Sequence, residues 1–198
     1  MTKVKITVVP TTNLPHADLA FAVHLYEQRF DAYADTERSD YTLDLMTIPH
    51  RSTTVGRQYA ADTLLATALH HRAHGIGVVL TAADIYTRGT NYVFGLATQG
   101  AAVVSSARID PAFWRGVPEI FSYTRRGRRF FERQYAKVLV HELGHAFGLP
   151  HCTDWNCAMH YSNSPTELFR KGDEYCQPCR RTFKASVPGR GAARGRSP

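Results

Sequence analysis

The sequence lacks any long apolar run. No stretch of its 198 residues approaches the roughly 18 apolar residues that a membrane helix requires, so no contact with a membrane is expected. The first ten residues, MTKVKITVVP, hold only a short alternating stretch before Pro10. This pattern predicts a strand rather than a signal peptide. We therefore expect a cytoplasmic protein, in a compartment where stable disulfides are uncommon.

Acidic residues are scarce near the C-terminal end. Residues 170–198 carry a net charge of +6 out of the total of +7, so the first 169 residues are nearly neutral. The segment 184–198, KASVPGRGAARGRSP, is rich in Gly, Pro, Ser and Arg and is predicted to be a disordered, basic tail. A solubilising role is favoured over a nucleic-acid arm for this tail and for a second cluster at Arg125, Arg126, Arg128 and Arg129.

The apolar pattern predicts one domain, because it shows no internal repeat and no linker before the tail. Helical spacing of apolar residues predicts three helices, and alternating or continuous apolar runs predict five strands. Gly75 stands where the second helix would be capped. The order of elements favours a mixed α/β (α+β) fold, with a mixed twisted sheet and helices packed on it. The predicted helices cover 15–30, 57–75 and about 129–147, and the predicted strands cover 3–9, 41–48, 75–81, 91–97 and 101–109.

The stretch HELGHAFGLPH, residues 141–151, has the spacing of a zinc site. His141 and His145 lie one turn apart on the same face of a helix, and Glu142 projects beside them. His151 could not share that face if the helix continued. Gly148 permits the chain to leave the helix, and Pro150 discourages its return. With that turn made, His151 completes a site with three protein ligands and one open position, which is typical of catalytic zinc.

The chemistry that this arrangement serves best is amide hydrolysis. Zinc bound in such a site lowers the pKa of a water molecule and polarises a carbonyl group. Glu142 would take the proton from the water and pass it to the leaving amine. The sequence therefore predicts a zinc-dependent peptidase that acts on peptides or proteins.

The chain has four cysteines, arranged as two closely spaced pairs. Cys152 and Cys157 form C-x4-C, and Cys176 and Cys179 form C-x2-C. This arrangement favours a second, structural zinc held by four thiolates. Two disulfides or a redox-active pair are the alternatives. If Cys152 instead bound the catalytic zinc, the remaining three cysteines would be one ligand short.

These motifs together resemble the archaemetzincins, a metzincin-type family of metallopeptidases. The match joins the histidine motif and Cys152 to Cys157-x-Met159 and to the second cysteine pair, and it extends upstream through residues 58–65, 91–95 and 101–109. The resemblance implies a zincin-like catalytic domain over residues 1–183, with a long active-site helix. Its upper part would cover 1–148, and a small zinc-stapled lower part would cover 149–183.

The resemblance also implies roles for two further features. Met159 would form a Met-turn, a hydrophobic floor beneath the zinc. Residues 91–97, NYVFGLA, would pair with an extended peptide substrate. Peptidase or aminopeptidase activity is implied, and a monomer is favoured.

The sequence departs from the family pattern after Met159, where it reads His160-Tyr161 in place of the more usual Asn-Phe. The order Met-His-Tyr is similar to the Met-turn of astacin-type metzincins, in which the tyrosine approaches the zinc. We hypothesise that Tyr161 reaches the metal or the developing oxyanion. A tyrosine that only packs beside the turn is the alternative.

Two further questions follow from the sequence. An aminopeptidase needs an acidic group near the substrate amine, and Glu167, Asp154 and Asp173 are candidates. His70, His71 and His74 suit the end of a helix, with an accessory metal as the alternative.

The competing function is a catalytically latent zinc-binding module that interacts with protein or RNA through the basic C-terminus.

Overall fold

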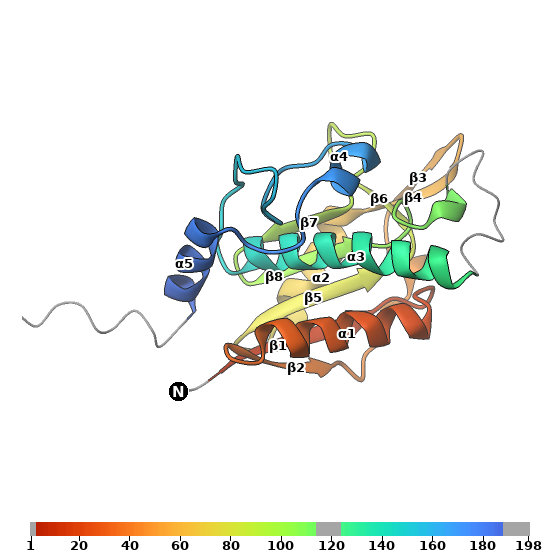
Figure 1. Ribbon diagram of the computed structural model, residues 1–198. Coiled ribbons are helices and arrows are strands. Elements are labelled where there is room, and N and C mark those ends of the chain that lie inside the picture. The colour runs from red at the N-terminus through yellow and green to blue at the C-terminus, as the bar shows by residue number, and fades with distance from the viewer. Residues whose placement is uncertain (1–2, 114–123, 188–198) are drawn as a thin grey trace, which may run out of the picture.

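A five-stranded mixed sheet forms the centre of the structure, a computed structural model that describes residues 3–113 and 124–187. The strand order is β2-β1-β5-β8-β7 (Figure 1). Four strands are parallel and the edge strand β7 runs antiparallel to β8. The expected mixed α/β fold is confirmed. The strands are β1 (Val4–Pro10), β2 (Ala34–Arg38), β5 (Ile76–Thr81), β7 (Gly95–Thr98) and β8 (Ala101–Ser105).

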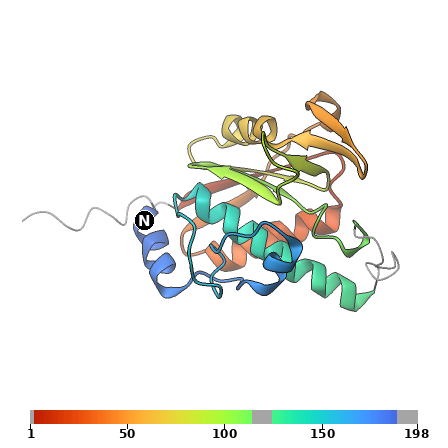
Figure 2. The same cartoon turned by 90° about the horizontal axis from the view of Figure 1, so that it is seen from above.

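Helices cover both faces of this sheet because its central strands are apolar on both sides. Val78 and Val104 face a core shared with α1 (His16–Phe30) and α3 (Arg125–Ala146). Val79 and Val103 face a second core shared with α2 (Ala61–His71). Figure 2 shows the resulting three layers, with α2 on one side of the sheet and α1 and α3 on the other.

A smaller three-stranded sheet lies beside α2. It consists of β3 (His50–Thr53), β4 (Gly56–Ala60) and β6 (Asp84–Tyr86), in the order β3-β4-β6. The chain that leaves β6 runs through residues 87–94 before it enters the edge strand β7. Ile85 in β6 forms an isolated bridge with Val93, so the small sheet packs against the segment that precedes the edge of the large sheet.

The long helix α3 is capped at both ends. The hydroxyl oxygen of Thr124 accepts a hydrogen bond from the backbone N–H of Gly127 at 3.0 Å. At the other end Gly148 has φ +90°, and the N–H groups of Gly148 and Leu149 donate to the carbonyls of His145 and Gly144 at 2.8 and 2.9 Å. This pair of bonds is a Schellman motif, which ends the helix and turns the chain.

The remaining chain packs against the end of α3. It contains the short helices α4 (Pro165–Arg170) and α5 (Gln177–Ser186). Leu168 and Phe183 anchor them in the core shared with α1 and α3. The expected division of the domain at Gly148 stays a prediction.

Several predicted elements differ from the structure. Residues 41–48 are not a strand, because Asp44 accepts a hydrogen bond from the N–H of Met46 and starts the 3₁₀ turn η1 (Leu45–Thr47). The second helix begins at Ala61, since residues 56–60 form β4. It ends at His71, so Gly75 is not its cap. The predicted strands 91–97 and 101–109 are shorter than expected, and a second short 3₁₀ turn, η2 (Pro111–Phe113), follows the latter.

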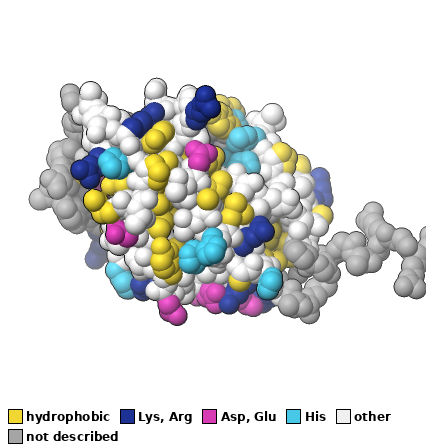
Figure 3. Space-filling model, turned by 180° about the vertical axis from the view of Figure 1, so that it is seen from behind, with side chains coloured by type: hydrophobic (Ala, Val, Ile, Leu, Met, Phe, Trp, Pro, Cys, Tyr) yellow, Lys and Arg dark blue, Asp and Glu magenta, His cyan; other side chains and the backbone are white. Residues whose placement is uncertain are grey.

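The boundary of the predicted tail is also corrected. Lys184, Ala185 and Ser186 form the last turn of α5, and the Val187 side chain is buried. Residues 188–198 lie outside the described part of the chain. None of the helices within the described part is long and apolar enough to cross a membrane. The face in Figure 3 carries basic and acidic side chains side by side, without a patch of one sign.

Candidate active site

Three histidines meet at the C-terminal end of α3. His141 and His145 lie one turn apart on the helix, and the turn at Gly148 brings His151 back beside them. The Nε2 atoms of His141 and His145 are 3.2 Å apart, and the three potential ligand atoms all lie within 4.8 Å of one another. Two nitrogen ligands about 2.0 Å from a tetrahedral zinc ion would be roughly 3.3 Å apart. The histidine group therefore fits a zinc ion.

Backbone carbonyls orient two of these rings. The Nδ1 atom of His141 lies 2.7 Å from the carbonyl oxygen of Ala158, and that of His145 lies 2.7 Å from the carbonyl oxygen of Leu149. With Nδ1–H donating to a carbonyl, the lone pair is on Nε2, which faces the other rings. Such outer contacts fix the tautomer of metal-binding histidines.

Burial sets the ionisation of the site. It lowers the pKa of all three histidines, which favours the neutral form that binds metal. Burial raises the pKa of Glu142 to about 8, and the Lys171 ammonium opposes this rise. The pKa of Lys171 itself falls to about 8 because it is buried. A nearby dication would lower the pKa of Glu142 and favour its carboxylate.

The histidines and Glu142 line a cleft with a volume of about 730 Å³. One wall is formed by Thr87 and residues 89–97, which include the first three residues of the edge strand β7, and the other by residues 161–163. Gly95 in β7 lies directly against the acid: a Cβ atom there would come within 2.5 Å of Cγ and 2.7 Å of Oε1 of Glu142. The edge strand and the acid therefore pack together only because residue 95 has no side chain.

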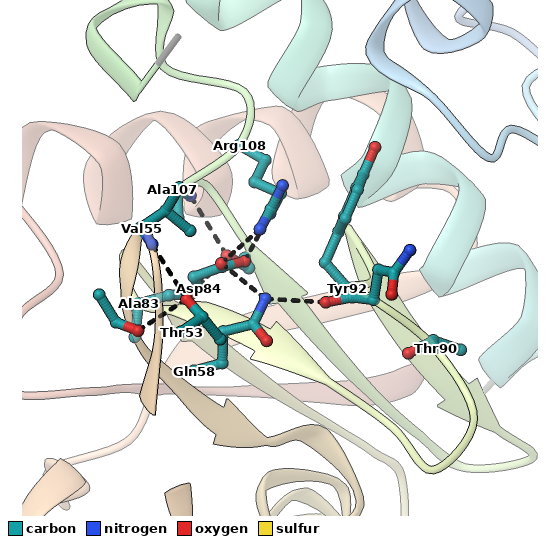
Figure 4. A network of polar contacts seen from close by, with 12 residues as sticks. Thr53, Val55, Gln58, Ala83, Asp84, Thr90, Tyr92, Ala107 and Arg108 are labelled. Carbon is teal, nitrogen blue, oxygen red and sulfur yellow. Dashed lines mark hydrogen bonds and ion pairs between the residues drawn. The ribbon is translucent and has the colours of Figure 1, made fainter. Parts of the chain in front are cut away.

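A buried polar network holds the wall of the cleft in place (Figure 4). Arg108 binds Asp84 through two hydrogen bonds of 2.7 and 2.8 Å. Gln58 donates both to Asp84 at 2.8 Å and to the carbonyl of Asn91 at 2.9 Å. The Arg108 guanidinium also lies 3.8 Å from the ring centre of Tyr92. Because these contacts originate in β4, β6 and the turn that follows β8, the small sheet helps to support this wall of the cleft.

The two walls meet at Tyr92 and Tyr161. The Tyr92 hydroxyl donates to the carbonyl oxygen of Asn163 at 3.3 Å. The Tyr161 hydroxyl donates to the side-chain oxygen of Asn163, while its ring lies 4.9 Å from that of His151. Tyr161 thus lines the cleft with its hydroxyl bound to Asn163. Met159 is fully buried and packs against α3 at Gly144, between the two helix histidines.

The four cysteines form a second group. Their sulfur atoms lie within 4.8 Å of one another, and those of Cys152 and Cys176 are 3.8 Å apart. All four are free thiols, so the alternative of two disulfides is not what the structure shows. A tetrahedral zinc with Zn–S bonds of about 2.3 Å would separate two sulfurs by roughly 3.8 Å. The cysteine group therefore fits its own zinc ion, separate from the histidine group.

The other candidate residues are not brought into the site. Among the residues that the structure describes, the histidine and cysteine groups are the only ones in which three or more potential metal ligands meet. His71 stacks on Tyr41 and touches His70 edge to face, outside any such group. Asp154, Glu167 and Asp173 do not line the cleft.

Of these three acids, Glu167 lies nearest to the cleft wall, since it accepts a hydrogen bond of 2.6 Å from the N–H of Asn163. Asp173 pairs with Arg29, and Asp154 caps its own loop.

Two residues of the site escaped the sequence prediction. Gly95 lay in the segment 91–97 that was expected to pair with substrate, but nothing local indicated its contact with Glu142. Lys171 lies 12 residues after Met159 and belongs to no recognisable motif. It nevertheless lines the cleft and contacts His141. Both contacts join segments that are distant in the sequence.

Comparisons with known proteins agree with this geometry. The profile of peptidase family M54 matches residues 63–185. The archaemetzincin of Pyrococcus furiosus is 31% identical over 97% of this chain and 98% of its own length. The crystal structure of the archaemetzincin of Methanopyrus kandleri has a TM-score of 0.70 and 27% identity, and covers 93% of this chain and 96% of that one. That of Archaeoglobus fulgidus, complexed with malonate, has a TM-score of 0.71 and 25% identity, and covers 90% and 99%.

The fold and these matches define a zinc metallopeptidase. Since the family profile covers more than half of the chain and the P. furiosus relative aligns over nearly all of it, the chain belongs to peptidase family M54, the archaemetzincins. The expected family is confirmed.

The contact between Gly95 and Glu142 yields a first prediction. Gly95→Ala should lower peptide hydrolysis by about 10²-fold, because the new methyl group displaces the acid and a shift of about 1 Å can cost that much. Circular dichroism should show an unchanged fold, since residue 95 lies at the start of an edge strand.

A double-mutant cycle with Glu142→Ala, read on the residual hydrolysis, provides the control. Alanine lacks Cγ, Cδ and Oε1, the atoms that a Cβ at residue 95 would meet, so Gly95→Ala should cost much less in that background. Equal losses in both backgrounds would contradict a direct clash.

Proposed function

We propose that the chain hydrolyses peptide bonds with a zinc ion held by His141, His145 and His151 and with Glu142 as general base. The observation that carries this proposal is the convergence of the three histidines and the acid in one cleft beside an edge strand. Zinc bound there would lower the pKa of a water molecule and polarise the substrate carbonyl. Glu142, held against Gly95, would accept the proton of the attacking water and donate it to the leaving amine.

The free edge of β7 supports binding of an extended substrate. Among the described strands, β7 pairs only with β8 and stands at the end of the strand order. Backbone N–H and C=O groups of a peptide can extend the sheet there, and the cleft would take its side chains. Cleavage within a chain and at its amino end are both compatible with this binding. Glu167, through its contact with Asn163, is the acid best placed to serve an aminopeptidase.

A second zinc bound by Cys152, Cys157, Cys176 and Cys179 would have a structural role. Burial raises the pKa of the Cys157 thiol, so a thiolate there requires a compensating positive charge. The N–H groups of Met159 and Cys176 each point at its sulfur, at 3.4 Å. Since Cys152 directly follows His151, this ion would fix the loop that presents the third histidine.

The test of the proposed reaction is cleavage of a diverse peptide library by the zinc-loaded protein, read by mass spectrometry. Glu142→Gln keeps the size of the side chain but removes the base. It should lower cleavage by at least about 10²-fold, since a positioned general base contributes roughly 10²–10⁴-fold. Glu132→Gln, on the same helix but paired with Arg128, is the control and should cut as the wild type does.

Cuts that persist in Glu142→Gln would contradict the role of this acid. The positions of the cuts would also separate an aminopeptidase from an endopeptidase. No cleavage by the wild type, together with RNA binding that weakens steeply with salt, would favour the latent binding module instead.

Tyr161 is proposed to stabilise the developing oxyanion after its hydroxyl leaves Asn163. Tyr161→Phe should then lower kcat by about 10²-fold with a smaller change in KM, as for other lost oxyanion donors. Asn163→Ala should preserve kcat, because it releases the same hydroxyl. Unchanged turnover of Tyr161→Phe would leave Tyr161 as a packing residue only.

The cysteine zinc is tested with the double variant Cys176→Ser/Cys179→Ser. Metal analysis should show one zinc per chain in place of two. Tm should fall by on the order of 10 °C, because about 1 kcal/mol shifts the Tm of a domain of this size by roughly 2–4 °C and structural zinc contributes several kcal/mol. Retention of both zinc ions by the double variant would refute the four-thiolate site.

A further inference from the structure

Lys171 buries its ammonium group beneath the cleft, where the proposed reaction gives it no part. The residue follows α4, and only 4% of it is exposed. Its Nζ atom donates to the carbonyl oxygens of Ala158 and His160, both at 3.0 Å. These two carbonyls flank Met159. Lys171 therefore ties the end of α4 to both sides of the turn that carries Met159.

The same ammonium group reaches a metal-binding histidine. Its Nζ atom lies 3.2 Å from Nδ1 of His141, and the Ala158 carbonyl accepts from both groups, at 3.0 Å from Nζ and 2.7 Å from Nδ1. The carbonyl that orients the His141 ring is thus itself held by Lys171. Partners one step removed from a metal typically change its affinity by about 10–100-fold when they are lost.

A second buried lysine provides a natural comparison. Lys137 on α3 is 1% exposed, and its Nζ atom binds the carbonyls of Leu168 and Phe169 at 3.1 and 2.8 Å. It resembles Lys171 in burial, in charge and in holding two carbonyls next to α4. Among the described contacts, its ammonium group reaches neither the turn at Met159 nor a histidine. If these lysines only satisfy buried carbonyl groups, replacing either one should have similar effects. If Lys171 also positions a metal ligand, only its replacement should affect the metal.

We propose that Lys171 is a positioning residue for the catalytic metal, which it serves by fixing the Ala158 carbonyl and through it the ring of His141. This inference rests on the proposed three-histidine site. Lys171 directly follows α4, and among the described hydrogen bonds its ammonium group alone links the end of this helix to both the Met159 turn and His141. The metal site would therefore depend on a contact from a segment 30 residues further along the chain.

Cobalt titration tests this role without relying on activity. Thiolate-to-cobalt charge-transfer absorption in the near ultraviolet reports the cysteine group, while weaker visible bands alone report a site of nitrogen and oxygen ligands. In Lys171→Met the cobalt affinity of the histidine site should fall by about 10–100-fold, and the charge-transfer signal should titrate as in the wild type. In Lys137→Met the free energy of unfolding should fall, but the cobalt affinity of the histidine site should stay at its wild-type value.

The outcomes separate this inference from the function on which it rests. A wild type without a histidine cobalt site would refute the three-histidine site itself. A wild-type affinity in folded Lys171→Met, or equal losses in Lys171→Met and Lys137→Met, would refute only the role of Lys171. Should Lys171→Met not fold, Lys171→Gln carries the test. Its polar side chain is one bond too short to hold both carbonyls, so an unchanged affinity there would also overturn the inference.

Discussion

The left-handed conformation of Gly148 is the constraint on which the active site depends. An α-helix rotates by about 100° per residue, so a continued helix would direct His151 away from His141 and His145. The Schellman motif at Gly148 stops the helix and reverses the chain within three residues. The same turn presents the carbonyl of Leu149 to Nδ1 of His145. One backbone conformation thus supplies the third histidine and also orients the second.

Side-chain hydrogen bonds, more than helices or strands, hold residues 149–187 in place after this turn. Residues 149–187 contain only two short helices, so many of their backbone carbonyls have no partner within a helix or sheet, and buried carbonyls need donors. Lys137 and Lys171 provide four such bonds. The four thiols, two from the start of this segment and two from its later part, come together in one group. The histidine site therefore lies between the layered part of the fold and a segment held by buried cations and, in our proposal, by zinc.

The sequence predicted those parts of the structure that depend on local spacing. The histidine and cysteine groups, the long helix and the mixed sheet follow from residues close together in the chain. Strand β2, ADTER, was missed because it is a polar edge strand. Residues 41–48 alternate like a strand, but the capping bond of Asp44 outweighs that pattern. The contacts of Gly95 with Glu142 and of Lys171 with Ala158 were out of reach, because each depends on how distant segments pack.

The account as a whole depends on two separate zinc ions at adjacent residues, His151 and Cys152. Anomalous diffraction at the zinc edge from crystals of the zinc-loaded protein tests this most directly. The account predicts two peaks in each chain, one among the three histidine rings and one among the four cysteine sulfurs. A single peak, or one ion bound by both His151 and Cys152, would contradict it.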